Sequence, residues 1–249
     1  MGLSLILSCE HGGNDVPAQY RALFRGRAAE RALAGHLGSD TGSLAVAKAL
    51  STRFGVKLFS STVTRLLVDL NRSLGHRRLF SPFSQKLDAA QRHGLLARYY
   101  LPYRAAVTQA VAEGTRGDQR VLHVSVHSFT PKLGRRCRTA DIGLLYDPAR
   151  PAERQLCAAW KAELDAVGGG LRVRRNYPYR GAADGLTTHL RGVFASARYL
   201  GIELELNQNL LAERPEAAVN AVAASLDNLL GSQSPGCTKS GVRAPRNNR

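Results

Sequence analysis

The amino-acid sequence predicts an α/β protein, a three-layer α/β/α sandwich in which helices cover both faces of a mixed, mostly parallel β-sheet. Two observations carry this prediction. Short apolar runs that suit buried strands alternate along the chain with longer stretches of helical periodicity. Several of these runs end in ionisable residues, as strands do where an open α/β sheet builds a binding site.

The expected elements of the first half follow from this alternation. An apolar run at Leu3–Leu7 is long enough for a buried strand, and Leu44, Val46, Ala47 and Leu50 form one apolar helix face. The expected elements are a strand at 3–7, short helix at 20–27, helix at 41–54, strands at 56–60 and 63–68, a basic lid at 75–83, and a helix at 88–114 kinked near Pro102.

The second half continues the alternation. In the strand expected at 121–126, Leu122, Val124 and Val126 lie on one face, with His123, Ser125 and His127 on the other. The remaining expected elements are strands at 142–146, 171–175 and 201–206, helices at 152–167 and 213–230, and a functional loop at 176–188 rich in Gly, Pro and Tyr. We therefore predict one domain over residues 1–230, followed by a disordered basic tail at 231–249.

The composition indicates a folded cytoplasmic protein. The 249 residues are 44% hydrophobic, which suffices for a full core, and no apolar run is long enough to span a membrane. The N-terminus lacks the basic region and the small-residue cleavage site of a signal peptide. Four cysteines, at 9, 137, 157 and 237, are far apart without CxxC spacing, so we expect reduced thiols.

The net charge of +16 favours a small anionic partner over a nucleic acid. Arginine accounts for 29 of the 35 basic residues, a bias that a GC-rich genome would also produce. The basic residues are dispersed, with small clusters at 135–138 and 172–175, and lack the continuous stripe typical of nucleic-acid modules. We therefore expect no nucleic-acid partner and a field that attracts an anionic substrate.

Four strand ends carry groups that suit hydrolytic chemistry: His11, the segment from Arg65 to Arg72, His127 and Glu205. Two histidines on separate loops and a carboxylate are the ligand set of a catalytic zinc that keeps a position open for water. Glu205 suits a general base, and Arg65 and Arg72 suit a clamp on a substrate carboxylate. The alternatives are a loop histidine with no ligand role and a solvated strand edge at Glu203 and Glu205.

Six segments in order along the chain resemble the N-formylglutamate amidohydrolase family: CEHGGNDVP, HLGSD, TRLLVDLNRS, VHSFTP, RNYPYRGAADG and IELELNQ. The resemblance covers about residues 1–230 and implies a fold similar to zinc carboxypeptidases and aspartoacylases. It implies that His11 and His127 bind zinc, that Glu205 is the base, and that Arg65, Asn71 and Arg72 hold the substrate.

The sequence departs from that wider fold group at one metal ligand. Carboxypeptidases and aspartoacylases have a Glu three residues after the first histidine, where this chain has Asn14. Asp40, in the shared HLGSD segment, is the preferred third ligand, and Glu10 is the alternative. Asn14 is then expected to donate to the metal-bound water or the substrate carbonyl, and Arg175 to contribute to substrate binding.

The resemblance implies one zinc ion per chain and hydrolysis of N-formyl-L-glutamate to formate and L-glutamate. In this mechanism zinc activates water, Glu205 moves the proton to the leaving nitrogen, and Arg65 is placed to share the oxyanion charge. The alternatives are an amidase or carboxypeptidase for another N-acyl amino acid or short peptide, and a protein that binds anions or nucleic acid without catalysis. The acyl group, the metal used in the cell and the oligomeric state stay open.

Overall fold

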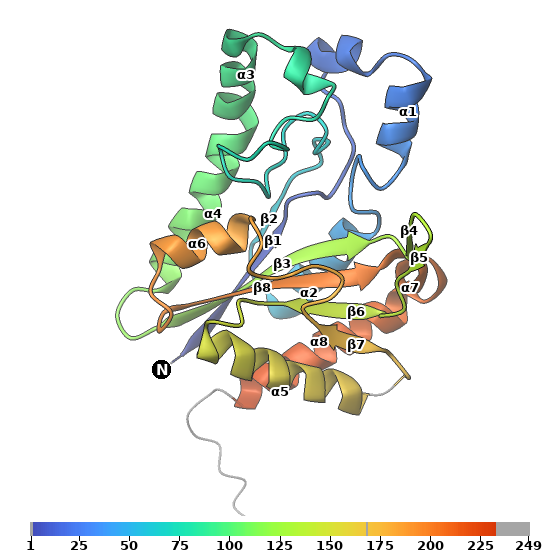
Figure 1. Cartoon of the computed structure of the whole chain (residues 1–249). Coiled ribbons are helices and arrows are strands. Elements are labelled where there is room, and N and C mark those ends of the chain that lie inside the picture. Colours follow the sequence, from blue (N-terminus) through green and yellow to red (C-terminus); the bar gives the residue numbers. More distant parts are fainter. Residues whose placement is uncertain (1, 168, 233–249) are drawn as a thin grey trace, which may run out of the picture.

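The computed structural model describes residues 2–167 and 169–232, which form one six-stranded sheet with helices on both faces (Figure 1). Along the sheet the strands are ordered β2 (Leu58–Ser60), β1 (Leu3–Cys9), β3 (Arg120–Phe129), β8 (Tyr199–Asn207), β6 (Ile142–Leu145) and β7 (Val173–Arg175). The first four strands are parallel, β6 is antiparallel to β8, and β7 is parallel to β6. The predicted α/β class and mixed, mostly parallel sheet are confirmed.

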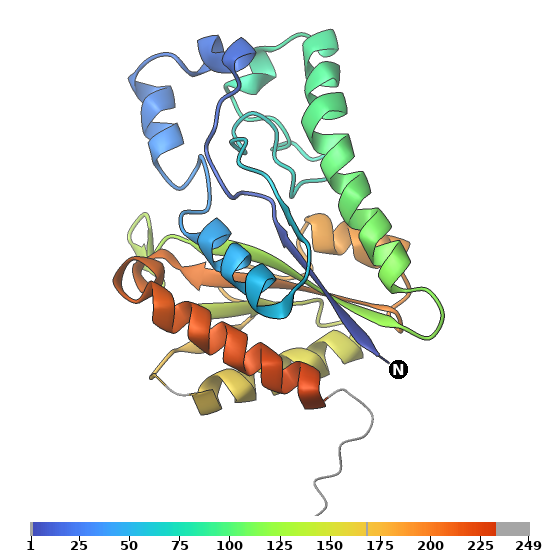
Figure 2. The same cartoon turned by 180° about the vertical axis from the view of Figure 1, so that it is seen from behind.

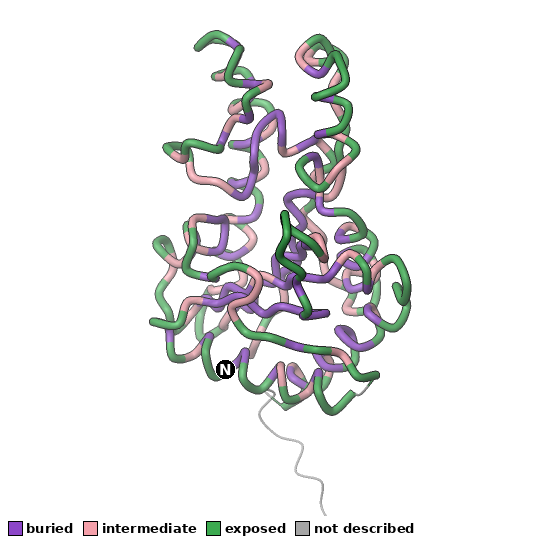
Figure 3. Tube along the Cα trace, turned by 45° about the vertical axis from the view of Figure 1, so that its right-hand side comes forward, coloured by how far each residue is buried: buried purple, intermediate pink, exposed green. Residues whose placement is uncertain are grey.

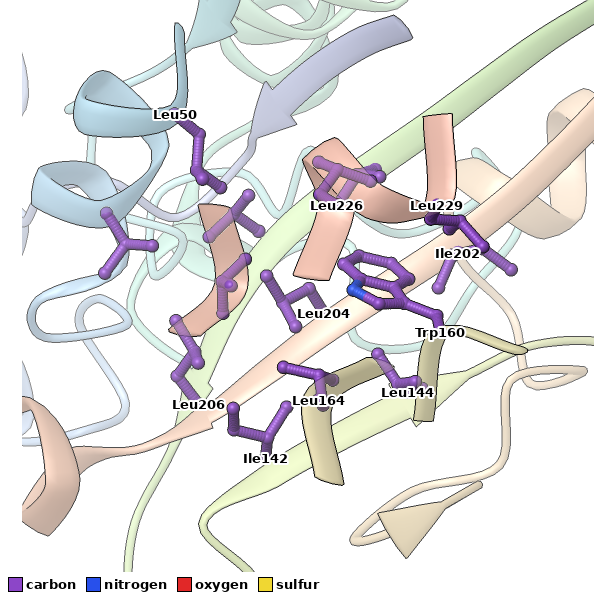
Figure 4. Packing of buried hydrophobic residues seen from close by; sticks show 14 of the residues in the cluster. Leu50, Ile142, Leu144, Trp160, Leu164, Ile202, Leu204, Leu206, Leu226 and Leu229 are labelled. Atoms are coloured by element: carbon purple, nitrogen blue, oxygen red, sulfur yellow. The ribbon is translucent and has the colours of Figure 1, made fainter. Parts of the chain in front are cut away.

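Three helices cover one face of the sheet: α2 (Ser43–Phe54), α5 (Pro151–Val167) and α8 (Pro215–Ser232) (Figure 2). Their apolar sides pack on leucine, isoleucine and valine side chains of the central strands. The indole of Trp160 donates to Ser225 Oγ at 3.0 Å. Figure 4 shows Leu204 of β8 within this cluster. Figure 3 shows that buried positions concentrate in the sheet, whereas the outer helix surfaces are exposed.

The opposite face carries α4 (Leu101–Gly114) and α6 (Leu186–Val193), which pack on Ile6, Val121 and Tyr199. The expected alternation in β3 is confirmed, because Leu122, Val124 and Val126 join the cluster beneath α2, α5 and α8. His123, Ser125 and His127 therefore point to the other face, where the register pairs His127 with Glu205. The polar side chains of two neighbouring strands thus meet on one face of the sheet.

The strand expected at 63–68 is absent from the described structure, and this expectation was wrong. Residue Val63 makes a single bridge with Asp15, and the chain then turns. Leu66 and Leu67 are buried among Phe24 and Leu95 in a separate apolar cluster rather than in a sheet. The apolar run therefore packs inside a lobe above the sheet. This lobe is built mainly from η1 (Ala18–Phe24), α1 (Arg27–Ala34) and α3 (Ala89–Leu95).

The helix expected at 88–114 begins with a capping box, in which the Asp88 carboxylate accepts from the Gln91 backbone N–H and the Gln91 side chain accepts from Asp88 N–H. Its irregular part is a π-helical turn, η3 (Leu96–Tyr100), directly before Pro102 in the first turn of α4. At that position the missing proline N–H needs no partner within α4.

Other boundaries differ from the expectations at specific places. The loop expected at 176–188 ends earlier, because α6 starts at Leu186. Further short elements were not expected: η2 (Ser84–Lys86), the hairpin of β4 (Lys132–Leu133) and β5 (Arg136–Cys137), and α7 (Gln208–Glu213). Residues 231 and 232 belong to α8 and so are not part of the tail expected at 231–249. Residues 233–249 lie outside the described residues. Among described residues, none of the helices is both long and apolar enough to span a membrane.

Replacing Leu204 with alanine is expected to lower the free energy of unfolding by about 2–5 kcal/mol. Leu204 is fully buried at the centre of the larger core, so the truncation leaves a cavity that neighbours fill only in part. Urea unfolding measures the change. Leu37→Ala is the control, because Leu37 is 54% exposed and should change stability by less than about 0.5 kcal/mol. Equal losses in both variants would contradict this account of the core.

Candidate active site

The loop after β1 places His11 at the carboxyl end of the parallel strands. Gly12 N donates to Ser61 O at 3.0 Å, and a Cβ on Gly13 would lie 2.7 Å from Thr62 O. The loop thus passes so close to the segment after β2 that Gly13 leaves no room for a side chain. Asp40 N in turn donates to His11 O at 2.9 Å, and this bond places Asp40 beside the carboxyl end of β1.

His11 and His127 face the same carboxylate oxygen. The Nδ1 atoms of His11 and His127 lie 3.3 and 2.8 Å from Asp40 Oδ2, and the two ring centroids are 5.1 Å apart. All three side chains are buried, and their ligand-type atoms lie within 4.8 Å of one another. The sequence expectation of two histidines and Asp40 in one place corresponds to this cluster.

Each histidine presents its second nitrogen to another carboxylate. His11 Nε2 lies 2.8 Å from Asp69 Oδ1, and His127 Nε2 lies 3.1 Å from Glu10 Oε2. When Nε2–H donates to these outer carboxylates, Nδ1 carries the free lone pair that faces Asp40 and can bind a cation. Histidines that bind metals are usually fixed in this way.

Glu10 is itself held by neutral donors. Ser125 Oγ donates to Glu10 Oε2 at 2.6 Å and lies 2.8 Å from His127 Nε2, while the Tyr103 hydroxyl of α4 donates to Glu10 Oε1 at 3.0 Å. Burial alone would raise the pKa of Glu10, but the hydrogen bond and charge of His127 hold it well below the ordinary value. Glu10 is thus an ionised carboxylate that orients His127.

The donor set fits a divalent metal of the zinc type. Two imidazole nitrogens and one carboxylate are a common set in catalytic zinc sites that leave a position for substrate or water. Burial opposes ionisation of Asp40, yet the charge of His11 and hydrogen bonds with both histidines hold its pKa well below the ordinary value. A buried, ionised carboxylate between two histidines is a suitable environment for a cation.

Arg65 connects the inner and outer carboxylates. Its Nη1 donates to Asp40 Oδ1 at 3.2 Å and its Nη2 to Asp69 Oδ2 at 3.0 Å. Burial would lower the pKa of Arg65, but the charges of Asp69 and Asp40 raise it above the ordinary value. These bonds orient both carboxylates. They also occupy two of the guanidinium donors that Arg65 would use in the expected clamp on a substrate carboxylate.

Asn71 and Arg72 lie beside the same cluster. Asn71 Oδ1 accepts from Leu186 N at 2.6 Å, and its Nδ2 is 3.5 Å from His127 Nε2. Arg72 Nη1 donates to the Asp184 carbonyl at 2.5 Å, while its buried Nε has no hydrogen-bond partner among described residues. Arg72 therefore retains donor capacity next to the cluster.

Glu205 brings an unpaired carboxylate oxygen to the site. It lies opposite His127 in the register of β3 and β8, and its buried Oε2 has no hydrogen-bond partner among described residues. Burial, followed by the charges of Asp40 and Glu203, raises the pKa of Glu205 to about 8, against the opposing effect of His127. A proton acceptor with a pKa near neutrality suits general acid–base work.

Two expected site residues are not brought to this cluster. Asn14 is exposed, and its amide donates to Leu33 O at 3.0 Å. Arg175 pairs with Leu144 in the register, so it shares the face covered by α5 and α8 rather than the face of Glu205. No described contact supports a substrate role for either side chain, because each is directed elsewhere by its local backbone.

Three supporting residues, Asp69, Ser125 and Tyr103, were not among the site residues expected from the sequence. For Asp69, its place in the DLNR run was a usable signal. Ser125 precedes His127 by two residues on the same strand face, so strand periodicity could have identified it. Tyr103 lies on α4, and nothing in the local sequence connects it to Glu10.

Metal binding at this cluster is expected to release protons and to strengthen as the pH rises. Burial would lower the pKa of His127, but hydrogen bonds with Asp40 and Glu10 raise it well above the ordinary value. His127 is then protonated in the metal-free protein, and Nδ1 must lose its proton before it binds a cation. Calorimetric titration with zinc in buffers of different ionisation enthalpy measures this release. An affinity that stays constant between about pH 6 and pH 8 would contradict it.

Comparisons with known proteins agree with the motif resemblance. A family model described as N-formylglutamate amidohydrolase matches residues 3–212. A gene product from Agrobacterium tumefaciens of known crystal structure is 31% identical, with a TM-score of 0.75 over 92% of this chain and 89% of its own. The crystal structure of N-formylglutamate amidohydrolase from Ralstonia eutropha JMP134 is 24% identical, with a TM-score of 0.69 over 92% of each chain, which shows the shared fold. A search of curated proteins found no match.

Proposed function

This chain belongs to the N-formylglutamate amidohydrolase family, and on that premise we propose that it hydrolyses N-formyl-L-glutamate to formate and L-glutamate with a zinc ion. Membership makes the chain an amidohydrolase. The proposal beyond family membership is that the metal is zinc and that the substrate is N-formyl-L-glutamate. An amidase for a different N-acyl amino acid or a short peptide is the alternative.

One observation carries the proposal: both histidines present Nδ1 to Asp40, while outer carboxylates hold their Nε2 atoms. A merely structural histidine pair would not need two ionised carboxylates at its outer nitrogens and a third between the rings. His11, His127 and Asp40 would hold the ion. When bound, a zinc ion supplies an activated water and a Lewis acid for the amide carbonyl.

The chain's own residues supply the proton transfer and the positioning. Glu205 accepts the proton of the attacking water on its free Oε2 and delivers it to the leaving nitrogen. Arg65 keeps Asp40 and Asp69 in place, and Arg72 offers its remaining donors to the substrate carboxylate next to the amide. We place the reaction in the cytoplasm, which Cys9, Cys137 and Cys157 support as free thiols.

The test is formate release by the purified, zinc-loaded protein. N-formyl-L-glutamate is compared with N-acetyl-L-glutamate and with a dipeptide of glutamate, before and after removal of metal by a chelator. We expect formate from the first substrate, loss of activity with the chelator and recovery with zinc. If the protein hydrolyses one of the other two compounds and not N-formyl-L-glutamate, that compound replaces N-formyl-L-glutamate as the proposed substrate. Activity that survives complete metal removal would overturn the proposed dependence on zinc.

A further inference from the structure

Arg138 is a buried arginine whose role the reaction described above does not explain. It follows the β4–β5 hairpin, which leaves the sheet where β3 ends (Figure 1). Its backbone N–H donates to Pro131 O at 2.8 Å, and its carbonyl accepts from Asn207 Nδ2 at 3.3 Å. Asn207 lies two residues after Glu205 on the same strand face, so Arg138 is fixed beside the strand ends that carry the site.

The Arg138 charge has no carboxylate partner among described residues. Among the described residues, the arginines that are buried as whole residues are Arg104, Arg138 and Arg150. Arg150 lies 3.8 Å from Glu153, whereas Arg104 donates to Leu70 O and lies over the Tyr100 ring beneath the 69–72 loop. A buried arginine without an anionic partner is costly. Within the described part of the chain, Arg104 and Arg138 both lack one, and Arg138 is the one of the two that is fixed beside Asn207 at the strand ends that carry the site.

The surroundings of Arg138 leave part of the guanidinium free. Only Nη1 makes hydrogen bonds with described residues, and its acceptors are the two Thr130 oxygens at 3.4 Å and the Tyr179 hydroxyl at 3.2 Å, all neutral. The guanidinium also lies 5.9 and 5.0 Å from the ring centroids of Phe129 and Tyr179. The planar group is thus held in place while Nε and Nη2 remain available for two parallel bonds to a carboxylate.

The position of Arg138 relates it to the reacting centre. Phe129 lies two residues after His127 on the same strand face, a separation of about 7 Å along the strand. In N-formyl-L-glutamate, four bonds of about 1.5 Å each separate the amide nitrogen from the side-chain carboxylate carbon.

A dianionic substrate needs two cations, and the structure offers a separate one for each carboxylate. Arg65 is occupied by Asp40 and Asp69, whereas Arg72 lies beside the cluster, where the carboxylate next to the amide would lie. We propose that Arg138 binds the side-chain carboxylate of the substrate and thereby determines the preference for an acidic over a neutral side chain. This inference rests on the proposed function, because it names the second half of the same substrate.

The test compares N-formyl-L-glutamate with N-formyl-L-glutamine, which differs only by the charge of the side chain. We expect Arg138→Gln to lower the ratio of their kcat/KM values by about 10- to 100-fold, the effect of losing a hydrogen bond to a charged group. Arg136→Gln is the matched control, because Arg136 is exposed on the same hairpin, and it should leave the ratio unchanged. Arg138→Lys keeps the charge without the paired geometry and should retain part of the preference.

A binding measurement separates this inference from the proposed function. Calorimetry gives the dissociation constants of L-glutamate and L-glutamine for the zinc-loaded wild type and for each variant, without turnover. We expect the wild type to favour L-glutamate and Arg138→Gln to lose that preference, with thermal melting used to select variants that remain folded. An unchanged ratio in a folded Arg138→Gln or Arg138→Lys variant would overturn the role of Arg138. Absence of hydrolysis with an intact, Arg138-dependent binding preference would instead overturn the proposed reaction.

Discussion

Replacing Glu205 with glutamine is expected to lower kcat by about 10²–10⁴-fold while zinc remains bound. Glutamine keeps the shape of the side chain but cannot accept the proton of the attacking water. The unpaired Oε2 of Glu205 is the feature that indicates this role, because a merely structural carboxylate in a buried position would have its oxygens paired. Steady-state formate release gives kcat, and the zinc content of the purified variant shows whether the cluster is intact.

Glu203→Gln is the matched control for this experiment. Glu203 lies on the same strand face two residues earlier, and its Oε1 accepts from Thr187 Oγ1 at 2.9 Å, a bond that a glutamine oxygen can also accept. We expect this variant to retain most of its kcat. Wild-type turnover in Glu205→Gln would remove Glu205 from the mechanism, and equal losses in both variants would indicate a general disturbance of β8.

Asp40→Asn is expected to weaken zinc binding far more than Glu10→Gln does. Asp40 lies between the two Nδ1 atoms, whereas the one histidine nitrogen that Glu10 contacts is the outer Nε2 of His127. Loss of an outer partner typically weakens metal affinity by about 10–100-fold, so Glu10→Gln should fall in that range and Asp40→Asn should exceed it. Competition with a chromophoric chelator measures both affinities.

The same pair of variants decides between the two carboxylates that the sequence left open. Both changes replace a buried carboxylate with its isosteric amide, so general damage to folding should be comparable and can be checked by thermal melting. A larger loss of affinity in Glu10→Gln than in Asp40→Asn would reverse the assignment and place Glu10 at the metal.

Much of the fold could be predicted because local periodicity reflects burial. The alternation in β3 separated Val124 and Val126 from Ser125 and His127, and the structure buries the two sets on opposite faces. The run at 63–68 is apolar without forming a strand of the sheet, because Leu66 and Leu67 pack into the lobe above the sheet. Hydrophobic pattern reports that a residue is buried without identifying the cluster in which it is buried.

The sequence by itself determined that the candidate residues His11, His127 and Glu205 would lie near one another, because the carboxyl ends of neighbouring parallel strands share one edge of the sheet. Only the tertiary structure decided how they are paired. Asp40 and His11 are far apart in the chain and meet through a backbone hydrogen bond, and Arg65 is committed to carboxylates rather than free for substrate. Which nitrogen faces which oxygen depends on side-chain directions set by packing across several elements, and no local sequence spacing encodes that information.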